Sequence, residues 1–326
     1  LFFNDNRTII RLNAMLMFFS FKFYFVHMVF MCFLAFIGQI ALFKFFRDVF
    51  CIHPFFNVIS SFLIHSVIFW SSGILKEVIL LFGLGFFLLA LKNVVTKTIS
   101  IRWWIILVVS CLLLCTIKIY VIIALIPSLL FLAWLKVSTN KAILLKFISI
   151  HIVCISMVFL FNHFFSELNI FELISNKRSD FIKIAIAEKA GSLISQQEMD
   201  SGVKGLCTIL PASIFNVLFR PIPGDFHSMI ILPSFFENLI FYFLAIISII
   251  YFKKPDTEKS ALLLSILSFV LILSAVIGLT TPVLGAIVRY KMPALPFIAI
   301  LFFSLIDVEK IKNKFPMVNK YLTHEI

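Results

Sequence analysis

The stretch FWSSGILKE, residues 69–77, decides how this chain folds. It places two serines, a glycine, a lysine and a glutamate between two apolar runs, at roughly 54–70 and 77–91. Apolar runs of this kind form membrane helices, and polar side chains between them are costly in lipid unless they reach water or serve a site. We therefore interpret the 69–77 segment as a connection at the membrane surface and as one wall of a site.

The whole chain has the composition of a membrane protein. Hydrophobic residues make up 62% of its 326 residues and charged residues 13%, and its mean hydropathy is +1.10. A soluble domain is nearer half apolar and a quarter charged. We predict an all-α fold, a polytopic transmembrane helix bundle that forms a single membrane domain over residues 1–326. The chain opens on Leu1 with no signal-peptide pattern, so we expect sequence to be missing upstream.

Apolar runs indicate about nine spans, judged against the roughly 20 residues that a helix needs to cross a bilayer. They lie at roughly 24–43, 54–70, 77–91, 103–117, 119–135, 143–165, 233–252, 260–279 and 293–306. The runs 103–117 and 119–135 are either one long helix broken near Lys118 and Tyr120 or a tight hairpin, which their combined length favours.

Basic residues assign a side of the membrane to each connection. Lysine and arginine gather in alternate connections, at 44–53, 92–102, 136–142 and 253–259, and in the tail after 306. Cytoplasmic connections carry such an excess, so we predict a cytoplasmic C-terminus. The long segment 166–232 is near neutral and becomes an extracytoplasmic loop, in which Asp180–Ser195 reads as a helix lying along the membrane surface. The 69–77 segment falls on the same outer side.

These connections also account for the net charge of +12, so nucleic acid is not an expected partner. The six cysteines form no CxxC pair and no cysteine–histidine cluster. We expect no metal, no disulfide framework and no cofactor. The motifs of nucleotide-driven and zinc or serine hydrolase chemistry are absent as well.

Three cationic corners fall on the predicted outer side, and the first is the 69–77 segment itself. Lys76, with the backbone amides at the start of the following helix, would bind phosphate or pyrophosphate. Trp70 and Glu77 flank it. The alternative is that Lys76 only extends to lipid headgroups, as membrane lysines often do.

The second corner is FRPIPGD, residues 219–225, where two prolines fix the backbone that presents Arg220. Arginine suits a phosphate because its guanidinium binds it with two parallel hydrogen bonds. The alternative is a rigid loop end in which Arg220 pairs with Asp225. Glu237, in the helix that follows, is either a site residue or the partner of an arginine.

The third corner is GAIVRYKMP, residues 285–293, which presents Arg289, Tyr290 and Lys291 before a helix-starting proline. The alternative is a plain connection between two helices. All three corners face the side on which ATP is not available but lipid-linked phosphates are.

With residues 69–77, LFRP at 218–221 and VRYKMP at 288–293, the chain resembles polytopic proteins encoded with bacterial surface-polysaccharide genes. Those proteins are similar to GT-C glycosyltransferases and to O-antigen or capsule polymerases. The resemblance implies a multi-pass protein of the bacterial cytoplasmic (inner) membrane. It also implies a polyprenyl-linked sugar donor, a glycan acceptor, membrane lipids and polysaccharide assembly proteins as partners, with transfer on the extracytoplasmic face.

GT-C enzymes place a catalytic aspartate or glutamate in the first extracytoplasmic loop as general base, and no such motif is found here. Either the base belongs to sequence missing upstream, or Glu77, Asp225 or Glu237 serves, or the protein is a polymerase with other chemistry.

For a transferase or polymerase, the cations Lys76, Arg220, Arg289 and Lys291 would hold the donor phosphate, while Trp70 and Tyr290 would orient sugar. A transporter or flippase for a similar lipid would need cations through the membrane depth, which the nearly charge-free spans lack. A non-catalytic scaffold would tolerate substitution of these charges.

Overall fold

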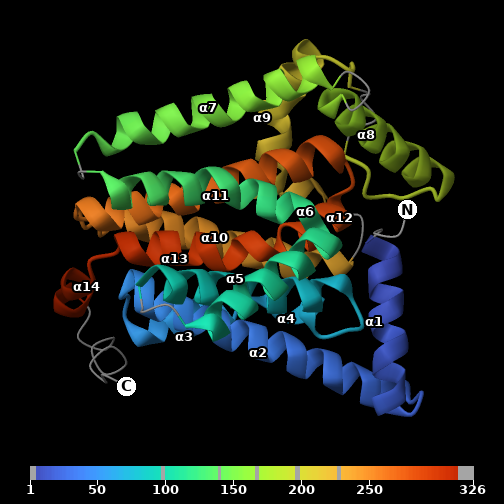
Figure 1. Ribbon diagram of the computed structural model, residues 1–326, viewed down its shortest axis with the longest axis horizontal. Coiled ribbons are helices and arrows are strands. Elements are labelled where there is room, and N and C mark those ends of the chain that lie inside the picture. Colours follow the sequence, from blue (N-terminus) through green and yellow to red (C-terminus); the bar gives the residue numbers. More distant parts are fainter. Residues whose placement is uncertain are drawn as a thin grey trace. The chain divides into compact units, whose positions relative to one another are not determined.

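The computed structural model describes residues 5–96, 100–138, 141–165, 169–194, 199–225 and 229–314. Over these residues the chain forms α-helices and short 3-10 helices, with two isolated β-bridges that join Leu193 to Val283 and Phe252 to Ile306. The helices, which are labelled in Figure 1, fall into two compact units that we describe separately. The predicted all-α class is confirmed for the described residues.

Unit 1 comprises Leu1–Ile123, Leu244–Lys254 and Leu295–Ile326. Its helices are α1 (Asp5–Ser20), α2 (Tyr24–Phe50), α3 (Pro54–Phe62), α4 (His65–Ser71), α5 (Lys76–Thr96), α13 (Leu295–Leu305) and α14 (Val308–Lys314), with the first part of α6 (Ile101–Val137) and the end of α10 (Leu232–Ile250).

Unit 2 comprises Ala124–Phe243 and Pro255–Ala294. It holds the remainder of α6 and α10, together with α7 (Ile143–Phe164), α8 (Ile170–Ala187), α9 (Val203–Phe219), α11 (Thr257–Thr280) and α12 (Leu284–Tyr290). Short 3-10 turns lie at η2 (Pro223–Asp225), η3 (Met229–Ile231) and η4 (Met292–Ala294).

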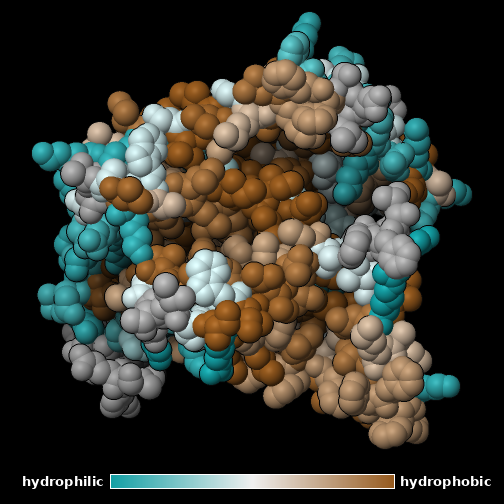
Figure 2. Space-filling view, in the orientation of Figure 1, coloured by the Kyte–Doolittle hydropathy of each residue, from teal (hydrophilic) through white to brown (hydrophobic). Residues whose placement is uncertain are grey.

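Within the described part of the chain, seven helical segments are long and apolar enough to cross a membrane, and the bent pair α3–α4 makes an eighth if it counts as one span. They are α2, α5, α6, α7, α10, α11 and the continuous stretch Leu284–Leu305. Apolar side chains accordingly cover much of the face shown in Figure 2. The sequence predicts about nine spans, and the two counts differ at α6, which is counted once although Lys118 interrupts it.

Helix α6 joins both predicted runs in 37 residues. At 1.5 Å per residue a straight helix of this length would measure about 55 Å, well beyond a hydrocarbon core of about 30 Å. Lys118 departs from helical geometry with φ −151° and ψ 79°, so the two arms of α6 are not collinear. The break lies at the residue that the sequence singled out.

The predicted outer loop 166–232 contains more structure than the sequence suggested. Helix α8 begins at Ile170, before the predicted start at Asp180, and ends at Ala187. The predicted helix beyond Ala187 is therefore wrong, because Lys189 adopts the left-handed φ of 51° that ends helices; its predicted end, Ser195, lies outside the described residues. Helix α9 was missed, since at 17 residues it is too short for a span.

Each unit contains one close contact between two of its own helices, and both contacts depend on glycine. In unit 1, a Cβ added at Gly38 of α2 would lie 2.5 Å from Cα of Phe82, and one at Gly85 of α5 would overlap the Gly38 carbonyl oxygen. In unit 2, a Cβ at Gly278 of α11 would overlap the Ser213 carbonyl oxygen of α9. Small residues let membrane helices approach closely enough for dispersion contacts, which must replace the hydrophobic driving force there.

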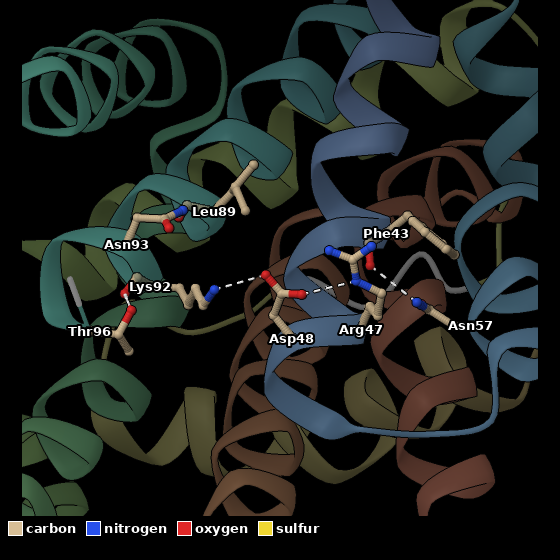
Figure 3. Close-up of polar contacts among 8 residues, drawn as sticks. All are labelled: Phe43, Arg47, Asp48, Asn57, Leu89, Lys92, Asn93 and Thr96. Carbon is tan, nitrogen blue, oxygen red and sulfur yellow. Dashed lines mark hydrogen bonds and ion pairs between the residues drawn. The ribbon is translucent and has the colours of Figure 1, made fainter. Parts of the chain in front are cut away.

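Polar contacts fasten the far ends of α2 and α5 (Figure 3). Asp48 pairs with Lys92 at 2.8 Å and with its neighbour Arg47 at 3.0 Å. The buried Asn57 of α3 donates from Nδ2 to the carbonyl of Phe43 at 3.1 Å. These contacts close the end of the α2–α5 pair opposite the 69–77 segment.

We predict that Gly85→Ala lowers the free energy of unfolding by about 1–3 kcal/mol, because the added methyl group forces α2 and α5 apart. Denaturant titration in detergent micelles measures the effect. Gly191→Ala is the matched control, since nothing lies within 4 Å of a Cβ there. Equal stability of the two variants would contradict a close α2–α5 contact.

Candidate functional site

The 69–77 segment is the connection from α4 to α5 in unit 1. Helix α4 ends at Ser71, and the hydroxyl groups of Ser71 and Ser72 donate to the carbonyls of Ile68 (3.3 Å) and Phe69 (2.8 Å). The two serines therefore close the end of a helix. The chain then bends, and α5 begins at Lys76, whose side chain is half-buried.

Glu77 forms a buried ion pair with Lys118. Its Oε1 lies 2.9 Å from Lys118 Nζ, and the two side chains are 0% and 5% exposed. The ammonium also lies 5.7 Å from the centre of the Tyr120 ring, a cation–π contact. Because charges are expensive to bury, each of these groups depends on the other.

The pairing explains the break in α6. The backbone of α6 departs from helical geometry at Lys118. The side chain of the same residue reaches Glu77, in the first turn of α5. A carboxylate in the first turn is also favoured by the helix dipole. Glu77 therefore acts in this structure as a structural partner that holds α5 and α6 together, and its role as a base stays a prediction.

The second corner lies at the end of α9 in unit 2. Arg220 follows the helix, its peptide bond to Pro221 is cis, and η2 follows. Arg220 Nη1 lies 3.0 Å from Asp225 Oδ1, and the backbone N–H of Ile222 donates to Asp225 Oδ2 at 2.9 Å. The pairing of Arg220 with Asp225 is thus the alternative that the structure realises. Both oxygens of Asp225 are engaged.

Lys291, in the third corner (residues 285–293), is hydrogen-bonded to the second corner (residues 219–225). Its Nζ donates to the carbonyl of Arg220 and to Oδ1 of Asn238, each at 2.9 Å, and the lysine is 3% exposed. Asn238 Nδ2 donates in turn to the carbonyl of Phe219 at 3.4 Å, and the Tyr242 hydroxyl donates to the same carbonyl. This ladder of hydrogen bonds satisfies the carbonyls at the end of α9 and fixes the position of Arg220.

Arg220 has hydrogen-bonding capacity beyond its pair with Asp225. Its side chain is 24% exposed, and Nε is shielded from solvent with no hydrogen-bond partner among the described residues. A buried donor without a partner is costly, typically about 1–3 kcal/mol. Nε and Nη2 form the edge that binds an oxyanion with two hydrogen bonds, while Nη1 stays on Asp225.

The other predicted site residues of unit 2 are sequence neighbours of Asn238 and Lys291. Glu237 is buried beside Asn238, and Arg289 and Tyr290 are half-buried at the end of α12, just before Lys291. The structure therefore brings Arg220, Asp225 and Lys291 together. Trp70, Lys76 and Glu77 belong to unit 1.

Arg178 is a polar residue that sequence reasoning missed. It is buried on α8 and donates from Nη1 to the carbonyls of Gly278 (3.3 Å) and Leu279 (3.2 Å) near the end of α11. Burial lowers the pKa of its guanidinium from the ordinary value. Its spacing from Ile182 and Ala185, which share the buried face of α8, was the available signal.

The site therefore belongs to a helical membrane protein with buried polar pairs near helix ends. Among the described residues, no group of histidine, cysteine, aspartate and glutamate has the geometry of a metal site. Comparison of the chain with known protein families, curated proteins and solved structures finds no match.

We predict that Glu77→Leu and Lys118→Met each lower the free energy of unfolding by about 3–5 kcal/mol, because each removes one partner of the buried ion pair. The double variant Glu77→Leu/Lys118→Met should recover most of that loss. Denaturant titration in micelles supplies the double-mutant cycle.

Lys92→Met is the control for this cycle, since its pair with Asp48 is more exposed and should contribute about 1 kcal/mol or less. Additive losses in the double variant would contradict a coupled pair.

Proposed function

We propose that the protein is a membrane glycosyltransferase-like protein that acts on a sugar linked to polyprenyl phosphate or pyrophosphate in surface polysaccharide assembly. The observation that carries the proposal is the Arg220 corner. Arg220, whose side chain is 24% exposed, pairs with Asp225 on one edge, and hydrogen bonds of Lys291, Asn238 and Tyr242 fix the backbone that presents it. Its other edge has the geometry that suits a phosphate. Neutral sugars alone would not require such a charged corner.

In the proposed topology, the two arms of α6 cross the membrane separately, with Lys118 between them. Together with the eight candidates counted above, this gives the nine crossings that the sequence predicts. The basic connections then lie in the cytoplasm of a bacterium, as does the C-terminus. The Arg220 corner and the 69–77 segment lie on the extracytoplasmic side, where lipid-linked sugars are the available donors.

The chemistry proposed for Arg220 is stabilisation of negative charge. When the sugar–phosphate bond breaks, the leaving phosphate gains charge, and a preoriented guanidinium lowers the barrier because it needs no reorganisation. Arg289 and Lys291 would add positive potential within unit 2, and Lys291 also holds the Arg220 carbonyl in place. Tyr290 would orient sugar, and the buried Glu237 is the candidate base of unit 2.

A transporter or flippase of the same kind of lipid is the second candidate. It is favoured by the Glu77–Lys118 pair, because ionisable residues inside membrane helices often mark transport pathways. A polymerase that joins whole repeat units would use the same donor chemistry as a transferase. A transporter would move polyprenyl-linked saccharide between leaflets without forming a glycosidic bond.

We predict that Arg220→Ala weakens binding of polyprenyl phosphate to the purified protein in nanodiscs by about tenfold or more, because a charge-assisted pair of hydrogen bonds is lost. Arg220→Lys should recover only part of the affinity, since lysine cannot bind the phosphate with two parallel bonds. Native mass spectrometry of the complex, with the uncharged polyprenol as reference lipid, measures both.

Arg102→Ala is the matched control, because Arg102 is exposed on the proposed cytoplasmic side. In cells, Arg220→Ala should abolish the surface glycan at a normal membrane level of the protein. Unchanged lipid binding in Arg220→Ala would overturn the proposed site, and glycan at the wild-type level in both Arg220→Ala and Lys76→Ala would overturn the proposed function.

A further inference from the structure

The corner between α1 and α2 displays an unusual cluster of exposed aromatic rings. Phe18, Phe19, Phe21, Phe23 and Phe25 are 82%, 66%, 78%, 69% and 74% exposed. In Figure 2 this corner is the apolar surface at the lower right, where Figure 1 shows α1 meeting α2. Such a contiguous apolar patch marks an interaction surface.

The backbone of the corner turns the chain sharply. Phe21 and Lys22 have φ values of 50° and 65°, in the left-handed region that bulky residues seldom adopt. The N–H of Phe23 donates to the carbonyl of Ser20 at 2.9 Å. Helix α1 therefore leaves the axis of α2 steeply (Figure 1), and the turn holds its rings outward rather than against the protein.

The exposed side of α1 changes character along its length. Arg7, Arg11, Met15 and Phe18 are all exposed and share one face at helical spacing. The basic residues lie at one end of that face and the apolar ones at the other. This order matches a lipid interface, in which anionic phosphates lie next to acyl chains.

The corner continues a surface that already faces lipid. Along the candidate span α2, Phe25, Val29, Phe33 and Phe36 form a stripe of exposed side chains. About 20 residues of a helix cross the hydrocarbon core. Counting back from the charged Arg47 and Asp48 therefore puts the start of α2 and the corner at the opposite interface.

We propose that α1 and the corner Phe18–Phe25 form an interfacial foot. Its phenyl rings lie among the acyl chains just below the headgroups, and Arg7 and Arg11 lie level with the phosphates of anionic phospholipids. The foot fixes the depth and tilt of α2. This inference does not rest on the proposed function.

Photo-crosslinking from the corner tests the foot. Benzoylphenylalanine replaces Phe18 or Phe21 in the full chain, reconstituted in vesicles of phosphatidylethanolamine and phosphatidylglycerol. After irradiation, mass spectrometry should find phospholipid adducts at a yield close to that from Phe33 on the lipid-facing stripe. The buried Phe46, which is 0% exposed, should give intramolecular products only.

Two results would overturn the foot. One is a covalent dimer as the main product from Phe18 or Phe21, which would assign the corner to a second copy of the chain. The other is a lack of lipid adducts from both positions while Phe33 gives them.

The headgroup preference is tested with the same reagent. Among the adducts from Phe18, phosphatidylglycerol should exceed its share of the vesicle lipid by about twofold or more, because basic residues near the membrane surface attract anionic lipid. The variant Arg7→Gln/Arg11→Gln should return the share to that of the vesicle. A preference that survives this change would refute the role of the two arginines.

Discussion

Hydrocarbon offers no hydrogen-bond partner, so every polar group inside the helices of this chain needs another group of the protein. The ion pair of Glu77 and Lys118 is the clearest case. It joins the first turn of α5 to the break in α6, at 2.9 Å and almost fully buried. The 69–77 segment leads into the first turn of α5, which contains Glu77. The pair therefore fixes the end of this segment against α6.

The same constraint shapes the Arg220 corner. A helix end leaves carbonyl groups without partners, and here Lys291, Asn238 and Tyr242 supply donors to the carbonyls of Phe219 and Arg220. The ladder that satisfies the backbone also immobilises the arginine. An arginine held in this way would lose little side-chain freedom on binding an anion, so the structural network suits the proposed binding site.

Close packing of helices adds a second source of stability, which is independent of the polar pairs. Gly38 with Gly85, and Gly278 with Ser213, let helices approach until backbones touch, and the gain is dispersion energy that lipid contacts do not match. Helix α7 differs, since none of its residues is fully buried. Its apolar side chains suit a helix surrounded mostly by lipid, whereas α5 and α11 form the interior of their units.

The sequence by itself determined the class of the fold and the places where it is interrupted. Apolar runs of span length predict membrane helices without any knowledge of their neighbours, because hydrocarbon selects them by composition. The break at Lys118 and the polar connection at Ser71 and Ser72 were visible for the same reason. Residues Arg220, Asp225 and Lys291 were also found, since charges stand out against an apolar background.

Only the tertiary structure decided how those charges are used. Pairing depends on which helices approach each other, and sequence spacing does not reveal that Glu77 meets Lys118 or that Lys291 reaches the Arg220 carbonyl. Helix α9 and the start of α8 escaped prediction because α9 is shorter than a membrane span and because the packing of α8 and α9 against α11 cannot be read from the sequence. The close contacts at the glycines could not be predicted either, because they depend on which helix packs against each glycine.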